Sequence, residues 1–108
     1  MRIVLDESIP RLLATVLVGH EAVTVARLGW DGVKNGELLR RAAAAGYSVL
    51  ITADRNLRYQ QNVAKSGIAL VVLRARSNRV EDYLPLIPSV LESLPAIKPG
   101  DVVEIGLD

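Results

Sequence analysis

The sequence predicts an α/β protein, a three-layer α/β/α sandwich built on a mostly parallel sheet. Short apolar segments bounded by turn residues alternate with segments of helical periodicity, and such apolar runs are typical of buried parallel strands. The short connections favour strands that lie side by side with helices on both faces. At 108 residues, half of them hydrophobic, the chain is long enough for one core, so we expect a single domain over residues 1–108.

Five apolar segments are predicted as strands because each is short and ends at a turn or a polar residue. They cover residues 2–5, 23–25, 48–52, 68–73 and 101–105. The last of them follows a Lys-Pro-Gly turn and is expected at an edge of the sheet.

Two helices are predicted in the first half of the chain. Residues 9–17 carry apolar side chains at the i, i+3, i+4, i+7 and i+8 spacing of an amphipathic helix, which Gly19 closes. A second helix begins at Asn35 or Gly36 and runs to Ala45, directly before another glycine.

Two further helices are predicted in the second half. A short helix covers residues 59–66, and a longer one covers residues 79–94 after a cap at Asn78. Pro85 and Pro88 each delete a helical hydrogen bond, so we expect a kink or two short helices there.

The composition limits the chemistry that the protein can use. It has no cysteine, which excludes disulfides and thiolate metal sites, and a single histidine, which excludes a histidine-rich metal site. A metal site would therefore use oxygen ligands and select Mg²⁺ or Mn²⁺. No signal-like segment precedes the first strand and no apolar stretch reaches membrane-spanning length, so we expect a soluble, cytoplasmic protein without a membrane partner.

Acidic residues follow two of the predicted strands. Asp6 and Glu7 come directly after residues 2–5, and Asp54 follows the strand at 48–52. Ligands of open α/β sheets bind at the carboxyl ends of the strands, so these carboxylates are expected close together. Because like charges repel, such a cluster favours a bound divalent cation. The alternative is that these residues are helix caps or loop acids.

Other polar residues are expected at the same edge. Glu37 lies in the first turn of a helix, and Asn35 and Asn56 could offer amide oxygens to a metal ion. Thr52 could orient a carboxylate or a water molecule. The alternatives are a helix-dipole contact for Glu37, turn caps for the asparagines and an ordinary strand role for Thr52.

Basic residues are concentrated between positions 55 and 79, where six arginines and lysines occur without a single acid. Such a block beside a carboxylate cluster suits a phosphodiester substrate, because basic side chains neutralise phosphates. We expect Arg55, Arg58, Arg74 and Arg76 to contact nucleic acid. The alternative is a solvated basic face.

Four short motifs together resemble a bacterial PIN-like domain family of uncharacterised proteins, which is related to PIN ribonucleases and to toxins of toxin–antitoxin pairs. They occupy residues 5–10, 34–39, 52–56 and 59–62, and their order and spacing carry the resemblance. It implies a PIN-like sheet whose acidic pocket binds Mg²⁺ or Mn²⁺ and hydrolyses RNA phosphodiesters. It also implies RNA or another single-stranded nucleic acid, an antitoxin protein and a second copy of the chain as partners.

The resemblance assigns roles to individual residues. Asp6 matches the family's first-strand aspartate, Asp54 matches the aspartate of its Thr-x-Asp motif, and Glu37 is the nearest match to the acid on the middle helix. These three are the expected catalytic residues and metal ligands, with Glu7 and Asn56 as further ligands. Asn35 and Asn56 stand where many relatives carry aspartate, and each change removes a negative charge that Glu7 could replace.

Two other classes of protein fit parts of the pattern. A non-catalytic PIN-like binding protein is favoured by the two asparagines. A receiver-like phosphoacceptor domain also carries acids after its first and third strands. It requires a lysine after the last strand, however, and none follows residues 101–105.

Overall fold

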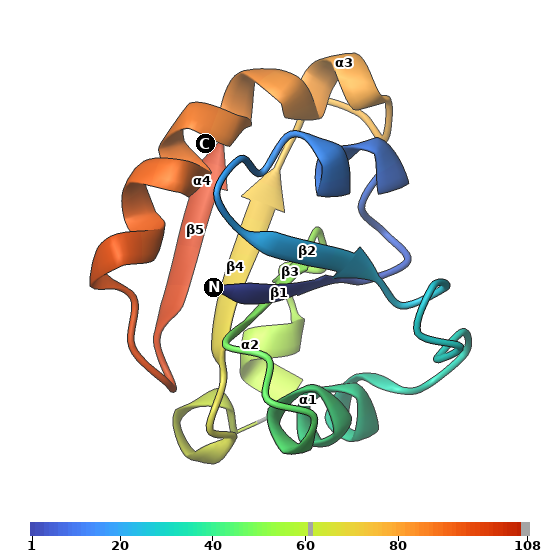
Figure 1. The fold of residues 1–108 in the computed structure, drawn as a ribbon, viewed down its shortest axis with the longest axis vertical. Helices are drawn as coiled ribbons and strands as arrows, with labels where there is room; N and C mark the ends of the chain where they lie inside the picture. The colour runs from blue at the N-terminus through green and yellow to red at the C-terminus, as the bar shows by residue number, and fades with distance from the viewer. Residues whose placement is uncertain (61, 107–108) are drawn as a thin grey trace.

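Five parallel strands form one sheet in the order β2-β1-β3-β4-β5 in the computed structural model, which describes residues 1–60 and 62–106 (Figure 1). The strands are β1 (Arg2–Leu5), β2 (Glu21–Thr24), β3 (Val49–Thr52), β4 (Ala69–Arg74) and β5 (Val102–Gly106). All five predicted strands are present, and β5 lies at an edge as expected. The predicted mostly parallel α/β fold class is confirmed.

Helical segments cover both faces of the sheet. On one face lie α1 (Asn35–Ala44), α2 (Leu57–Gln60) and the 3₁₀ helix η2 (Val63–Lys65), and on the other lie the 3₁₀ helix η1 (Arg11–Thr15), α3 (Val80–Tyr83) and α4 (Ile87–Ser93) (Figure 1). Because side chains alternate along a strand, Ile3 and Leu5 of β1 enter the core beneath α3 and α4, whereas Val4 enters the core beneath α1. No helix in the described part of the chain is long and apolar enough to cross a bilayer.

The predicted helix over residues 9–17 is wrong in type. The chain forms the five-residue 3₁₀ helix η1, in which the N–H of Val16 donates to the carbonyl of Leu13 at 3.2 Å. Leu13 and Leu17 are buried as the apolar spacing predicts, but Leu12 is half exposed. The β-branched residues in this segment disfavour a longer α-helix, and tertiary burial fixes only one side of it.

The two predicted C-terminal helices are interrupted more often than expected. The segment over residues 59–66 divides into α2 and η2, and its Gln61 lies outside the described residues. The segment over residues 79–94 divides into α3, the 3₁₀ helix η3 (Leu84–Leu86) and α4, and the 3₁₀ helix η4 (Leu94–Ala96) follows. Prolines occupy the first turns of η3, α4 and η4, where their missing N–H groups are tolerated. The predicted cap at Asn78 is wrong, because Arg79 holds the N-cap position.

The strand order determines where a ligand can bind. The chain passes from β1 to β2 on one side and then crosses to β3 on the other side of β1, so the direction of winding changes between β1 and β3. In sheets with this order the crevice for ligands lies at the carboxyl ends of those two strands. The acids that follow β1 and β3 are therefore placed at the switch point.

Replacing Leu50 by alanine should destabilise the fold by about 2–5 kcal/mol, because Leu50 is fully buried at the centre of β3 and its removal leaves a cavity. The free energy of unfolding in urea measures this loss. The matched control is Leu12→Ala at a half-exposed position, which should cost less than about 1 kcal/mol. Equal losses in the two variants would contradict the assignment of β3 to the core.

Candidate functional site

Asp6 and Asp54 are brought together at the carboxyl ends of β1 and β3. Asp6 directly follows β1, and Asp54 lies two residues beyond β3. Thr52, the last residue of β3, is fully buried between them. Its hydroxyl donates to Oδ2 of Asp6 and accepts a hydrogen bond from the backbone N–H of Asp54 at 3.0 Å. One hydroxyl therefore contacts both residues.

The carboxylate of Asp6 is held in a fixed orientation. Its Oδ1 accepts hydrogen bonds from the hydroxyl of Ser8 and, at 3.0 Å, from the backbone N–H of Ser8. The Ser8 hydroxyl also accepts from the N–H of Ala53 at 2.9 Å, which links the chain after β1 to the chain after β3. Ser8 was not among the residues predicted for the site, although aspartate side chains often accept a hydrogen bond from the backbone two residues later in a turn.

Asp54 makes a second turn of the same kind. Its Oδ1 accepts from the backbone N–H of Asn56 at 2.9 Å, and its Oδ2 accepts from the side-chain amide of Asn35, at the start of α1, at 3.4 Å. Asn56 thus contacts Asp54 through its backbone, whereas Asn35 contacts it through its side chain. Rotation of the Asn35 amide by half a turn would present its oxygen instead of its nitrogen.

The pKa of Asp6 is raised above its usual value. Burial is the main cause, and the negative charge of Asp54 adds to it. Hydrogen bonds from Ser8 and Thr52 oppose the rise. The charged form of Asp6 is therefore disfavoured in the folded protein, and a cation close to Asp6 would favour it.

Glu37 and Glu7 are not gathered around the aspartates. The carboxylate of Glu37 accepts hydrogen bonds from Arg40 at 2.8 Å and from Arg41 at 3.1 Å, and these contacts lower its pKa. Glu7 is exposed beside Asp6. Among residues 1–60 and 62–106, no three acidic or histidine side chains are placed to share one metal ion. The two aspartates form the centre without a third acid.

Three neighbouring hollows follow this edge of the sheet. The first, of about 390 Å³, is lined by Asp6, Glu7 and Asp31, and the second, of about 460 Å³, shares Glu7 with it and extends to Tyr83. The third, of about 290 Å³, shares Tyr83 with the second and ends at two arginines. The row therefore runs from a hollow with three acids and one arginine, Arg11, to a hollow with two arginines and no acid.

Two wall residues of these hollows were not selected from the sequence. Asp31 lies in the glycine-rich loop before α1, where an Asp-Gly pair indicates only a turn. Tyr83 ends α3, is nearly buried, and was part of the predicted C-terminal helix pattern. The charge of Asp6 raises the pKa of Tyr83, after burial as the larger cause, which places the two side chains near one another.

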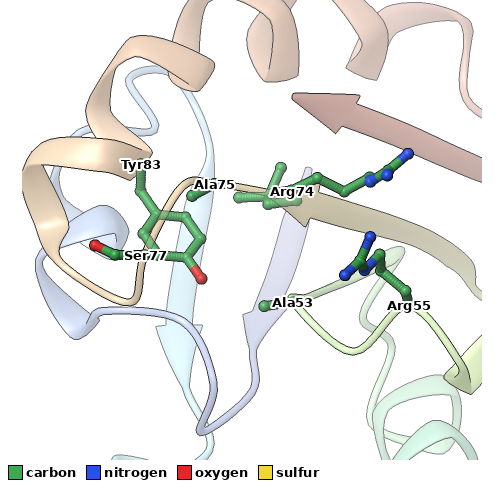
Figure 2. Close-up of a pocket in the computed structure, with 7 residues that line it drawn as sticks. Ala53, Arg55, Arg74, Ala75, Ser77 and Tyr83 are labelled. Atoms are coloured by element: carbon green, nitrogen blue, oxygen red, sulfur yellow. The ribbon is translucent and has the colours of Figure 1, made fainter. Parts of the chain in front are cut away.

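The predicted phosphate-binding arginines have different surroundings. Arg55 and Arg74 line the third hollow, on the side opposite Tyr83 (Figure 2). Arg58 forms an ion pair with Glu104 of β5 at 3.2 Å and lies over the ring of Tyr59. Arg76 is exposed beyond β4. The structure thus brings two of the four arginines to one hollow.

Comparison with known proteins identifies one family. A family model described as a PIN like domain matches residues 1–75, a range that includes β1 to β4, both aspartates and Arg74. This match confirms the resemblance predicted from the four short motifs. No curated protein and no solved structure matches the chain.

The raised pKa of Asp6 predicts how stability depends on pH when metal ions are removed by a chelator. At Asp6 the folded state binds a proton more readily than the unfolded chain, so the contribution of this carboxyl to the free energy of unfolding should fall as pH rises above about 4, the pKa of an unfolded aspartate. The fall should end once pH exceeds the raised pKa. Asp6→Asn should remove this component, so that its stability relative to the wild type increases with pH.

Urea denaturation across this pH range measures the effect. The control is Glu92→Gln at an exposed position, whose curve should run parallel to that of the wild type. A curve for Asp6→Asn that runs parallel to that of the wild type would contradict the raised pKa of Asp6.

Proposed function

The chain belongs to the PIN-like domain family, and on this premise we propose that it is a metal-dependent ribonuclease that hydrolyses RNA phosphodiester bonds. The observation that carries the proposal is the pair of aspartates, Asp6 and Asp54, joined by the buried hydroxyl of Thr52 at the switch point of the sheet. Family membership supports a nuclease-type function, and the site supplies the chemistry for it.

The donor set fits Mg²⁺ or Mn²⁺. All the available ligands are oxygen atoms, which hard divalent ions prefer, and Mg²⁺ is commonly held by one or two carboxylates with water and substrate phosphates completing the shell. Asp6 and Asp54 would supply the two carboxylates, and the amide of Asn35 lies against Asp54. Burial and the negative charge of Asp54 raise the pKa of Asp6, and a bound cation would offset both by favouring the charged carboxylate.

A bound cation would supply acidification of a water molecule and neutralisation of charge on the scissile phosphate. The residues of the chain prepare the site for it. Ser8 and Thr52 fix the orientation of the Asp6 carboxylate, so that little reorganisation is needed. Asp54 is fixed in the same way by the backbone of Asn56.

The remaining predicted residues extend this proposal. Glu7 lines two of the hollows beside Asp6 and is the nearest additional acid, whereas Glu37 would have to leave Arg40 and Arg41 to act as a ligand. Arg55, Arg74 and Arg76 would contact RNA phosphates, and Arg58 would do so by exchanging Glu104 for a phosphate. By the family relation we also propose an antitoxin protein and a second copy of the chain as partners.

A second candidate function is non-catalytic binding of nucleic acid by the same surface. The observation that favours it is that, among the residues that the structure describes, no third acid is placed to share one metal ion with Asp6 and Asp54. Asn35, in contact with Asp54, contributes no charge where an aspartate would. Cleavage activity separates this function from the first.

Single-stranded RNA should be cleaved by the purified protein in Mg²⁺ or Mn²⁺, and the activity should disappear with EDTA. Asp6→Asn and Asp54→Asn should each lower the cleavage rate by about a hundredfold or more, because each removes a charged ligand while preserving side-chain volume. Denaturing gels of a labelled RNA over time measure the rate.

Two controls sharpen this experiment. Glu92→Gln removes an exposed acid from α4 that lines none of the three hollows, and it should leave the rate unchanged. Glu37→Gln tests the acid on α1, and a small effect is expected because Arg40 and Arg41 already engage its carboxylate. Wild-type protein that binds RNA without metal-dependent cleavage would favour the non-catalytic function.

A further inference from the structure

We propose that the hollow between Tyr83 and the arginines Arg55 and Arg74 is a subsite for one phosphate group of a nucleic-acid strand whose scissile phosphate lies at Asp6 and Asp54. The inference deepens the proposed function and rests on it for the identity of the strand. The anion-binding character of the hollow rests on its own lining.

The charge of the hollow is uncompensated. Its seven lining residues include two arginines and no acid: Ala53, Arg55, Leu73, Arg74, Ala75, Ser77 and Tyr83. In the described part of the chain neither Arg55 nor Arg74 forms an ion pair, unlike Arg58 and Arg79. Two guanidinium groups beside one hollow repel each other, and an anion between them would remove that repulsion.

Arg74 carries a further sign of a missing partner. Its Nε atom is buried and has no hydrogen-bond acceptor, and it is the one such buried side-chain atom within the described residues. A buried N–H without an acceptor costs free energy, and that of a cationic group costs more. The two terminal nitrogens of the Arg74 guanidinium are not buried in this way, and phosphate oxygens suit them as acceptors, because guanidinium groups bind phosphate through paired hydrogen bonds.

Tyr83 supplies a neutral donor on the opposite wall. Figure 2 shows its hydroxyl directed into the space beside Ala53, across from Arg55 and Arg74. The hydroxyl of Ser77 is already engaged, since it donates to Asp82 at 2.5 Å and accepts from the backbone of Arg79 at 3.1 Å. The polar contacts available to a ligand are therefore the two arginines and Tyr83.

The hollow is positioned to act on the same strand as the aspartates. The second hollow, lined by Ser8, Ala53 and Tyr83, connects it to the surroundings of Asp6. Ser8 bonds to Asp6, and Ala53 lies between Thr52 and Asp54 in the chain. A strand with one phosphate at the aspartates would thus extend toward the arginines along one continuous edge.

The test is the affinity of a single-stranded RNA octamer in EDTA, where cleavage cannot occur, measured by fluorescence anisotropy at several salt concentrations. Arg55→Gln and Arg74→Gln should each weaken binding about tenfold and reduce the slope of log affinity against log salt by about 0.7, the value for one phosphate contact. Tyr83→Phe should weaken binding about threefold without changing the slope, because its hydroxyl carries no charge.

Arg79→Gln is the matched control. It removes the same charge from an exposed arginine of the same basic block that pairs with Glu81 outside the hollow. Binding within about twofold of the wild type is expected for it. Losses for Arg55→Gln and Arg74→Gln no larger than for Arg79→Gln would overturn the subsite. Circular dichroism melts confirm that each variant is folded.

The failure of the subsite and the failure of the nuclease proposal give different results. If wild-type protein cleaves RNA but the two arginine variants bind normally, only the subsite is wrong. If the arginine variants lose affinity but the wild type never cleaves, the subsite stands and the nuclease proposal is wrong.

Competition by octamers with a 5′-phosphate, a 3′-phosphate or neither identifies the source of the phosphate. If an octamer with a terminal phosphate competes better than the one without, and Arg74→Gln abolishes this difference, the subsite holds a terminal phosphate. If the three octamers compete equally, the subsite holds an internal phosphodiester.

Discussion

The hydroxyl of Thr52 is the contact on which the site depends, because it joins two strands and two aspartates at once. Parallel pairing of β1 with β3 aligns Leu5 with Ile51, so the next residues along the two strands, Asp6 and Thr52, meet inside the protein. The same hydroxyl accepts a hydrogen bond from the backbone N–H of Asp54, which fixes the turn that follows β3. A shift of register by one residue would turn Thr52 away and separate the aspartates.

The sequence was a good guide to the strands and to the main acids, for physical reasons that also explain its failures. Buried parallel strands are continuous apolar runs, so their ends, and with them Asp6 and Asp54, could be located from local pattern. Local pattern does not determine whether a helical segment forms α-helical or 3₁₀ hydrogen bonds. The segment around Leu13 forms a 3₁₀ helix, although the expected side is buried. Tyr83 and Asp31 reach the edge only through tertiary packing, which no spacing along the chain reveals.

Glu37 illustrates the same limit for charged residues. Its place at the start of α1 suggested a ligand directed at the sheet edge, but Arg40 and Arg41, one turn later, compete for its carboxylate. Among the described residues no ion pair involves Asp6 or Asp54, and burial raises the pKa of Asp6, so a bound cation would favour its charged form. Asp6 lines the hollow at one end of the row, and Arg55 and Arg74 line the hollow at the other end. The carboxylate that would attract a cation is therefore separated from the arginines that would attract a phosphate.

The most direct test of a divalent-cation site at the aspartate pair is thermal unfolding during titration with Mn²⁺. A ligand that binds only the folded state raises the melting temperature by mass action, so the wild type should gain stability over the micromolar to millimolar range of metal. Asp54→Asn should lose most of this gain, whereas Glu92→Gln should keep it. A wild-type melting temperature that does not change at millimolar Mn²⁺, or an equal gain in Asp54→Asn, would contradict a metal site at Asp6 and Asp54.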